Sequence, residues 1–193
     1  MNTLDYLKVT EEEIENGIKD EFGAVYSADG KRLLKFENGD LKEYSIKEGT
    51  VYICHGAFEY SSLKKINIPD GVTHIGNEAF RRTKIKEIIL PDSVQFIGKG
   101  AFDECGRLTN IEIPDNVTEI GEKSFNNAKK LLSVILSDSV IDYSFFKAFI
   151  ISSSCRVLIH TMPAMLLFFK NIPLLFLYTL FLVACAIVYE VFM

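Results

Sequence analysis

Apolar and polar residues alternate in short stretches that return along the chain at a nearly constant spacing. In the stretch LKKINIP, the apolar Ile66 and Ile68 alternate with Lys65 and Asn67, which is the period of a β-strand with one buried face. The same apolar set recurs as Leu63, Ile66, Ile68; Ile85, Ile88, Leu90; Leu108, Ile111, Ile113; and Leu131, Val134, Leu136. The pattern predicts one strand in each repeat.

A second set of recurring columns follows each predicted strand. The phenylalanines Phe58, Phe80, Phe102 and Phe125 are separated by 22, 22 and 23 residues. Each follows a small residue and lies five positions after an isoleucine, in the columns Ala57, Ala79, Ala101, Ser124 and Ile53, Ile75, Ile97, Ile120. A unit of about 22 residues cannot bury its own apolar face, so neighbouring units must stack. The sequence therefore predicts a repeat solenoid with a parallel sheet on the concave side and short turns or helical turns on the convex side.

Two further columns suggest how each unit turns. A proline follows the predicted strand at Pro69, Pro91 and Pro114, where its missing N–H ends the hydrogen-bond ladder. A glycine recurs at Gly76, Gly98 and Gly121, where we expect a tight turn or a close approach between units that leaves no room for a Cβ.

The repeated pattern resembles that of a known family. The stretches IPDGVTHIGNEAF and VQFIGKGAFDECGRLTNIEIP resemble the BspA-like leucine-rich repeat, over about Tyr44 to Val140. Cys54 replaces the glycine of this pattern and Ser137 replaces its proline. The resemblance implies a curved leucine-rich-repeat solenoid, displayed on microbial surfaces for adhesion or other protein binding, and it implies no catalysis.

We expect the repeats, residues 44–143, to follow an N-terminal cap, residues 1–43, made of a helix and a β-hairpin. Thr10 before three glutamates is a typical helix N-cap, and Gly23 is the expected stop. Asp29-Gly30 between two apolar runs predicts the hairpin turn. This cap would cover the open edge of the first repeat.

The C-terminal part has a different composition. Residues 144–170 are interpreted as a degenerate repeat or linker, and residues 171–193 as a hydrophobic helix. Ile172 to Tyr189 is 18 residues without a charge, which as a helix spans about 27 Å, close to the ~30 Å hydrocarbon core of a bilayer. Three interpretations stay open: a transmembrane helix, an out-of-frame tail of a truncated repeat gene, and a hydrophobic cap.

Charge and leader signals bear on partners and localisation. The chain has a formal net charge of −5 and no concentrated Lys/Arg stripe, which argues against nucleic acid as a partner.

The N-terminus lacks the basic and apolar regions of a secretory signal peptide. If the tail spans a membrane, the basic residues before it, Lys147, Arg156 and Lys170, favour a cytoplasmic location for the repeats, whereas the family resemblance implies the cell surface. Localisation between these two stays open.

The varied strand positions between the core columns are the candidate site for a protein partner. In leucine-rich repeats they project from the concave sheet; here they are Lys65, Asn67, Glu87, Ile89, Asn110, Glu112, Ser133 and Ile135. Four strands about 4.8 Å apart give a face about 15–20 Å wide, which suits one modest contact.

No motif indicates catalysis, a cofactor, a metal site or a small-molecule substrate. The four cysteines include no C-x-x-C pair, and neither a P-loop nor a G-x-G-x-x-G is present. The sharpest enzymatic alternative pairs Cys54 with His55 or His74, but Cys54 occupies the glycine column inside a repeat, so packing explains it better. We therefore expect a non-enzymatic binding module; the alternatives are a membrane-anchored structural protein and a truncated or frameshifted fragment of a longer repeat protein.

Overall fold

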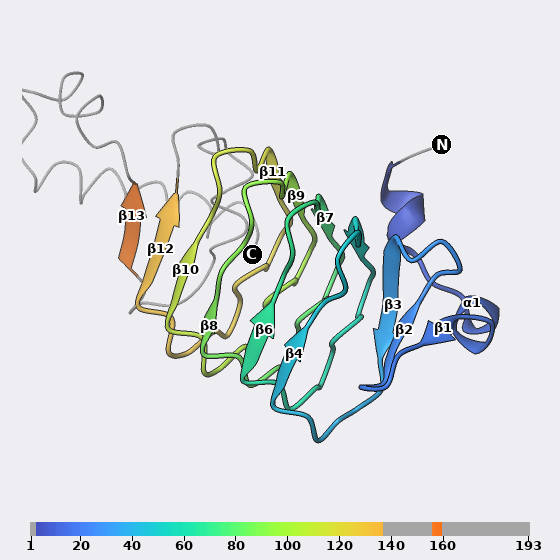
Figure 1. The fold of residues 1–193 in the computed structure, drawn as a ribbon. Coiled ribbons are helices and arrows are strands. Elements are labelled where there is room, and N and C mark those ends of the chain that lie inside the picture. The colour runs from blue at the N-terminus through green and yellow to red at the C-terminus, as the bar shows by residue number, and fades with distance from the viewer. Residues whose placement is uncertain (1–2, 137–155, 160–193) are drawn as a thin grey trace, which may run out of the picture. The chain divides into compact units, whose positions relative to one another are not determined.

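The computed structural model describes residues 3–136 and 156–159 (Figure 1). The chain begins with a 3-10 turn, Thr3–Leu7, and one short helix, α1, Glu11–Glu15. Short strands make up the rest: β1 Ile18–Lys19, β2 Ala24–Tyr26, β3 Arg32–Phe36, β4 Glu43–Ser45, β5 Tyr52–Ile53, β6 Lys65–Asn67, β7 His74–Ile75, β8 Glu87–Ile88, β9 Phe96–Ile97, β10 Asn110–Glu112, β11 Glu119–Ile120, β12 Ser133–Leu136 and β13 Arg156–Ile159.

The repeats form a solenoid of stacked coils with a parallel sheet on each of two sides. On one side run β4, β6, β8, β10, β12 and β13, all pointing the same way in Figure 1. On the other side, β5, β7, β9 and β11 extend the hairpin strand β3 into one seven-stranded sheet, in the order β1-β2-β3-β5-β7-β9-β11. The stacked solenoid predicted from the repeat is confirmed.

The expectation of one strand per repeat was wrong, because each coil contributes a second, two-residue strand. His74 and Ile75 pair in parallel with Phe96 and Ile97 of the next coil. Ladder hydrogen bonds such as Gly98 N–H to Ile75 C=O, 2.8 Å, hold the pair. A strand this short buries only about one side chain per coil, so it leaves no alternating pattern for sequence reading to detect.

A column of phenylalanine rings fills the interior between the two sheets. The rings of Phe58, Phe80, Phe102 and Phe125 stack nearly parallel, with centroids 5.2, 5.3 and 5.5 Å apart. All four side chains are buried, and Phe36 of the hairpin continues the column, tilted by 40° against Phe58. Aromatic contacts at this spacing stabilise the fold beyond the gain from burying the rings. The column therefore stabilises the packing of each coil on the next.

The glycine column lies where the backbones of adjacent coils come closest. A Cβ on Gly98 would lie 2.5 Å from the backbone nitrogen of Asn77 and 2.6 Å from the carbonyl carbon of Gly76. Gly121 and Gly76 are equally confined by backbone atoms of the coil before them. The close approach predicted for this column is confirmed, and backbone atoms cannot move aside as a flexible side chain could.

The N-terminal segment adds a helix and a hairpin before the first coil. Thr10 is the N-cap of α1, as the sequence predicted, and it also forms a capping box with Glu13. The helix ends at Glu15 rather than near Gly23, because the chain leaves helical geometry after the C-cap Asn16 and enters β1. The hairpin around Asp29-Gly30 forms from β2 and β3, and β3 pairs in parallel with β5.

A buried hydrogen-bond chain connects the hairpin to strand β4. Tyr44 donates to the Asp20 carboxylate over 2.6 Å, so the 2.6 Å bond between the two tyrosine hydroxyls is donated by Tyr26. The Tyr26 oxygen then accepts from the Lys47 N–H at 3.1 Å. Burial raises the pKa of Tyr44 above its ordinary value, so the hydroxyl remains a donor. The chain of bonds joins residues that are distant in the sequence into one unit.

The parallel sheet continues beyond the residues in which the repeat columns can be read. Arg156–Ile159 pairs with β12 in register, with Arg156 beside Ser133 and Ile159 beside Leu136. The predicted tail, residues 171–193 with its segment Ile172 to Tyr189, lies outside the described residues, as does the rest of residues 144–170. Among the residues that are described, no helix is long and apolar enough to span a membrane.

We predict that Gly98→Ala lowers the free energy of unfolding by about 1–3 kcal/mol, because the new methyl group meets backbone atoms of the preceding coil. The matched control is Gly39→Ala: no atom lies within 4 Å of the position that its Cβ would take, so we expect a change below about 0.5 kcal/mol. Urea unfolding followed by circular dichroism measures both variants. Equal unfolding midpoints for the two would contradict the close-packed glycine column.

Candidate binding surfaces

The predicted partner-binding residues occupy equivalent positions on successive coils, on β6 of the two-stranded sheet β4-β6 and on or directly after β8, β10 and β12 of the four-stranded sheet β13-β12-β10-β8. Glu87 lies beside Asn110, and Asn110 lies beside Ser133. Glu112 lies beside Ile135 in the second row. The structure therefore places the predicted residues in two parallel rows, here called the strand face: Lys65, Asn67, Glu87, Ile89, Asn110, Glu112, Ser133 and Ile135.

The strand face has two further members that sequence reasoning missed. Glu43 and Ser45 of β4 lie beside Lys65 and Asn67 and are exposed. The signal was present in the sequence, because Tyr44 and Ile46 fill the two core columns of a repeat and both are buried.

The strand face is polar except at two positions, Ile89 and Ile135. Lys65, Asn67, Glu87, Asn110 and Glu112 are exposed, and the pairing of Glu43 with Lys65 sets opposite charges side by side. Ile89 directly follows β8 at the position equivalent to Asn67 and Glu112, and its side chain is 85% exposed. An exposed isoleucine within a polar surround has the composition of a contact centre with a polar rim.

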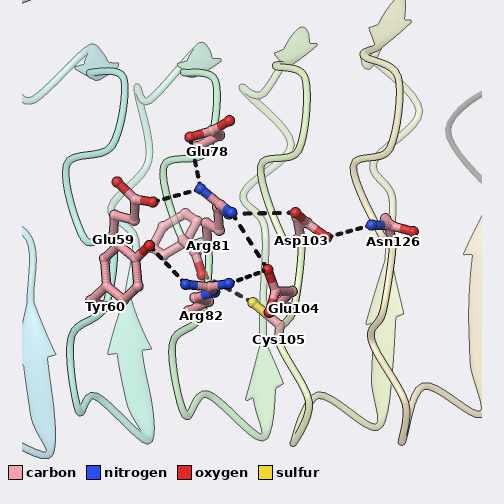
Figure 2. Close-up of polar contacts among 10 residues, drawn as sticks. Glu59, Tyr60, Glu78, Arg81, Arg82, Asp103, Glu104, Cys105 and Asn126 are labelled. Atoms are coloured by element: carbon pink, nitrogen blue, oxygen red, sulfur yellow. Dashed lines mark hydrogen bonds and ion pairs between the residues drawn. The ribbon is translucent and has the colours of Figure 1, made fainter.

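A network of charged side chains joins three coils on the turns that follow β5, β7 and β9 (Figure 2). Arg81 lies at its centre, with its guanidinium nitrogens 3.1 Å from Glu59, 3.4 Å from Glu78 and 3.5 Å from both Asp103 and Glu104. Figure 2 shows Glu59 approaching Arg81 from one neighbouring coil and Asp103 and Glu104 from the other, whereas Glu78 lies on the same coil as Arg81.

Arg82 forms the second half of this network. It lies 2.9 Å from the Glu104 carboxylate, donates to the Tyr60 hydroxyl over 2.9 Å, and its guanidinium lies 5.1 Å from the centre of the Tyr60 ring. The hydrogen bond from Arg82 lowers the pKa of Glu104 below its ordinary value. Asn126 of the next coil donates to Asp103 over 2.9 Å, so the network links adjacent coils side chain to side chain.

The arginine network was not anticipated from the sequence, although a signal existed. The position after each repeated phenylalanine is acid, base, acid and amide in turn: Glu59, Arg81, Asp103 and Asn126. Residues 22 or 23 positions apart become neighbours on stacked coils, so this alternation places opposite charges in contact. Because the charged groups are already paired with one another, we assign the network to holding the coils together.

A ladder of side-chain acceptors follows the glycine column. The Asn77 N–H donates to Nδ1 of His55 over 2.8 Å, and the Lys99 N–H donates to Oδ1 of Asn77 over 2.9 Å. His55 must therefore be neutral with its proton on Nε2. Burial, with a smaller effect from the Lys8 charge, lowers the pKa of His55 below its ordinary value.

The structure gives no support to the alternative in which Cys54 is a nucleophile. Cys54 is fully buried beside Val25 and Leu34, and burial raises the pKa of its thiol to about 11. Its neighbour His55 has Nδ1 occupied by the Asn77 N–H. A thiol with so high a pKa is rarely ionised near neutral pH and is a weak nucleophile. Cys105 is also buried with a raised pKa, so both behave as the core thiols predicted from the sequence.

Sequence comparison assigns the repeat to a family. The family model of the BspA type leucine rich repeat region matches residues 34–152 in six copies, which is more than half of the chain. The chain belongs to the BspA-type leucine-rich repeat family. The match begins inside β3, so this BspA-type repeat region extends further toward the N-terminus than the four units read from the phenylalanine column. No curated protein sequence gives a significant match.

The fold of the chain is similar to that of a solved structure. The pneumococcal vaccine antigen PcpA aligns over 80% of this chain and 45% of its own, with a TM-score of 0.65 and 23% identity. A leucine rich cell surface protein from Faecalibacterium prausnitzii aligns over 53% of this chain and 37% of its own, with a TM-score of 0.41 and 27% identity. The chain thus spans less than half the length of either protein, and the first similarity supports the leucine-rich-repeat fold.

We predict that His55 makes the protein less stable in mild acid. Because its pKa in the folded protein is below the ordinary value of about 6.5, the unfolded chain binds the proton more readily. The stabilising effect of the neutral ring is therefore full above about pH 6.5 and declines as the pH falls toward the folded pKa. Urea unfolding between about pH 7.5 and 5.5 measures this decline.

The matched variant is His55→Asn, which introduces the side chain that Asn77 carries at the next step of the ladder. Asparagine keeps an acceptor for the Asn77 N–H but does not titrate. We expect His55→Asn to lose less stability than the wild type over this pH interval. The same pH dependence in both proteins would show that His55 does not contribute to it.

Proposed function

We propose that this chain is a non-enzymatic module that binds a protein partner through the strand face. The observation that carries the proposal is Ile89, whose side chain is 85% exposed between the polar positions Asn67 and Glu112 of the same row. Burying such a side chain against a partner is favourable by about 1.5–3 kcal/mol, whereas exposing it gives the free protein no benefit. An adhesive role is one form of this function.

The dimensions of the strand face support a moderate contact. The strands from β4 to β13, about 4.8 Å apart, extend over about 24 Å, more than the four units expected from the sequence. Because these strands are only two to four residues long, the face covers part of a typical partner footprint of about 800 Å² and suits one moderate contact or part of a larger one. The outward residues differ from coil to coil while the inward residues repeat, so the variable positions carry the specificity.

The N-terminal elements have a supporting role in this proposal. The hairpin β2–β3 covers the open end of the first coil, acting as the cap of a solenoid whose terminal units would otherwise expose apolar side chains. The pairing of β3 with β5 and the bond from Tyr44 to Asp20 support this assignment. Residues 1–43 then form the cap and residues 44–143 the binding repeats.

We predict that Ile89→Ala combined with Glu112→Lys weakens partner binding by about 1–2 kcal/mol, which is roughly five- to thirtyfold. The matched control is Ile18→Ala with Glu21→Lys, which also removes an exposed isoleucine and an exposed acid but lies in the N-terminal segment. A pull-down from surface-labelled proteins, with the unaltered chain as bait, identifies partners. Titration of each partner against both variants then measures the affinity. Equal affinity of the two variants would exclude the strand face.

A second proposal concerns attachment to a membrane, and the charge-free segment Ile172 to Tyr189 favours it. If this segment spans a bilayer, the full chain should stay with the membrane pellet after extraction at alkaline pH. A matched variant with Leu177→Lys and Val183→Lys should move to the soluble fraction, because each buried charge costs about 3 kcal/mol. Recovery of the unaltered chain in the soluble fraction would rule out a spanning helix.

A further inference from the structure

The edge of the solenoid at which the strands of the strand face begin has a distinct composition. Before each strand, two outward positions flank one core residue, as in Lys84-Ile85-Lys86, where Ile85 is buried and both lysines are exposed. Residues two positions apart in an extended chain point to the same side. The coils therefore present two outward columns along this edge.

Backbone hydrogen bonds show that these columns are continuous from coil to coil. The Lys86 N–H bonds the carbonyl of Lys64 at 3.3 Å, and the Thr109 N–H bonds the carbonyl of Lys86 at 3.0 Å. The Leu132 N–H bonds the carbonyl of Thr109 at 2.8 Å. Positions 64, 86, 109 and 132 are thus direct neighbours, and the column two residues earlier contains Lys84, Arg107 and Lys130.

Five exposed cations occupy these two columns over four coils, and we call them the basic edge: Lys64, Lys84, Lys86, Arg107 and Lys130. Within residues 3–136 and 156–159, none of the five forms an ion pair. The nearby acid Glu104 is already engaged by Arg81 and Arg82. The sequence showed no Lys/Arg stripe because these cations are separated along the chain, and only coil stacking brings them together.

We propose that the basic edge binds an anionic polysaccharide, a linear sugar chain with sulfate or carboxylate groups, lying along the solenoid axis. The cations recur with the coil spacing of about 4.8 Å, so they form a row that suits an extended ligand with repeated charges. Neutralising several such charges releases counterions and drives binding. The two columns, at positions 62, 84, 107, 130 and 64, 86, 109, 132, contain no aromatic residue, so the row itself offers no stacking platform of the kind that single-stranded nucleic acid uses.

The row is separate from the strand face in the residues it uses. Its cations precede the strands, whereas Ile89 and Glu112 lie on the strands or directly after them. A polysaccharide on the basic edge therefore does not depend on the protein partner proposed above, and the two functions can be tested apart.

The test is the affinity of a heparin-derived oligosaccharide for the full chain in non-ionic detergent, measured by calorimetry at several salt concentrations. We expect binding that weakens steeply as salt rises. The variant Lys84→Glu, Arg107→Glu, Lys130→Glu should bind at least about tenfold more weakly at low salt, with a smaller salt dependence. Circular dichroism checks that each variant is folded.

The matched control is Lys31→Glu, Lys47→Glu, Lys99→Glu, which changes the net charge equally at exposed positions away from the basic edge. It should retain most of the affinity, and neutral dextran should not bind. Absence of heparin binding at low salt, or equal losses in the two triple variants, would overturn the proposal. Tighter binding of a single-stranded oligonucleotide of equal charge would overturn the assignment to a polysaccharide.

Discussion

The contact between one coil and the next is the constraint on which the rest of this structure depends. Parallel backbone hydrogen bonds set the distance between coils, and the glycine column lets the backbones approach until a Cβ on Gly98 would lie 2.5 Å from Asn77. At that distance the phenylalanine rings meet at 5.2–5.5 Å, within the range in which stacked aromatic rings attract each other. Glycine permits the approach, and phenylalanine fills the space that it leaves.

This stacking converts sequence spacing into surface geometry. A residue of the repeats lies next to the residue 22 or 23 positions away, so each surface column behaves as one element even though its members are distant in the chain. Three columns illustrate the consequences: Glu59, Arg81 and Asp103 form ion pairs between coils; His55 and Asn77 accept backbone N–H groups of the next coil; and Lys64 and Lys86 bring like charges together. The ion-paired columns hold adjacent coils together, whereas the cations of the basic edge form no ion pair with any of the described residues.

The two sides of the solenoid were unequally visible in the sequence. The longer strands alternate over several residues, and the glycine and phenylalanine columns repeat without exception in the central units, so the stacked coils and their core could be predicted. The strands β5, β7, β9 and β11 are two residues long and left no pattern. The helix was predicted at Thr10 because capping is local, but its end was misplaced, since the turn into β1 depends on pairing with β2.

The candidate surfaces divide in the same way. The strand-face residues between the core columns could be named from the repeat. Glu43 and Ser45 of β4 were missed, because their repeat has Tyr44 where the later repeats have an aliphatic residue. The arginine network and the basic edge could not be named, because their charges look scattered when the chain is read in order. Sequence by itself determined what lies inside each coil, since burial selects the same residue type at every repeat. Only the tertiary structure decided which outward residues are neighbours, because contacts between coils join positions that no local pattern connects.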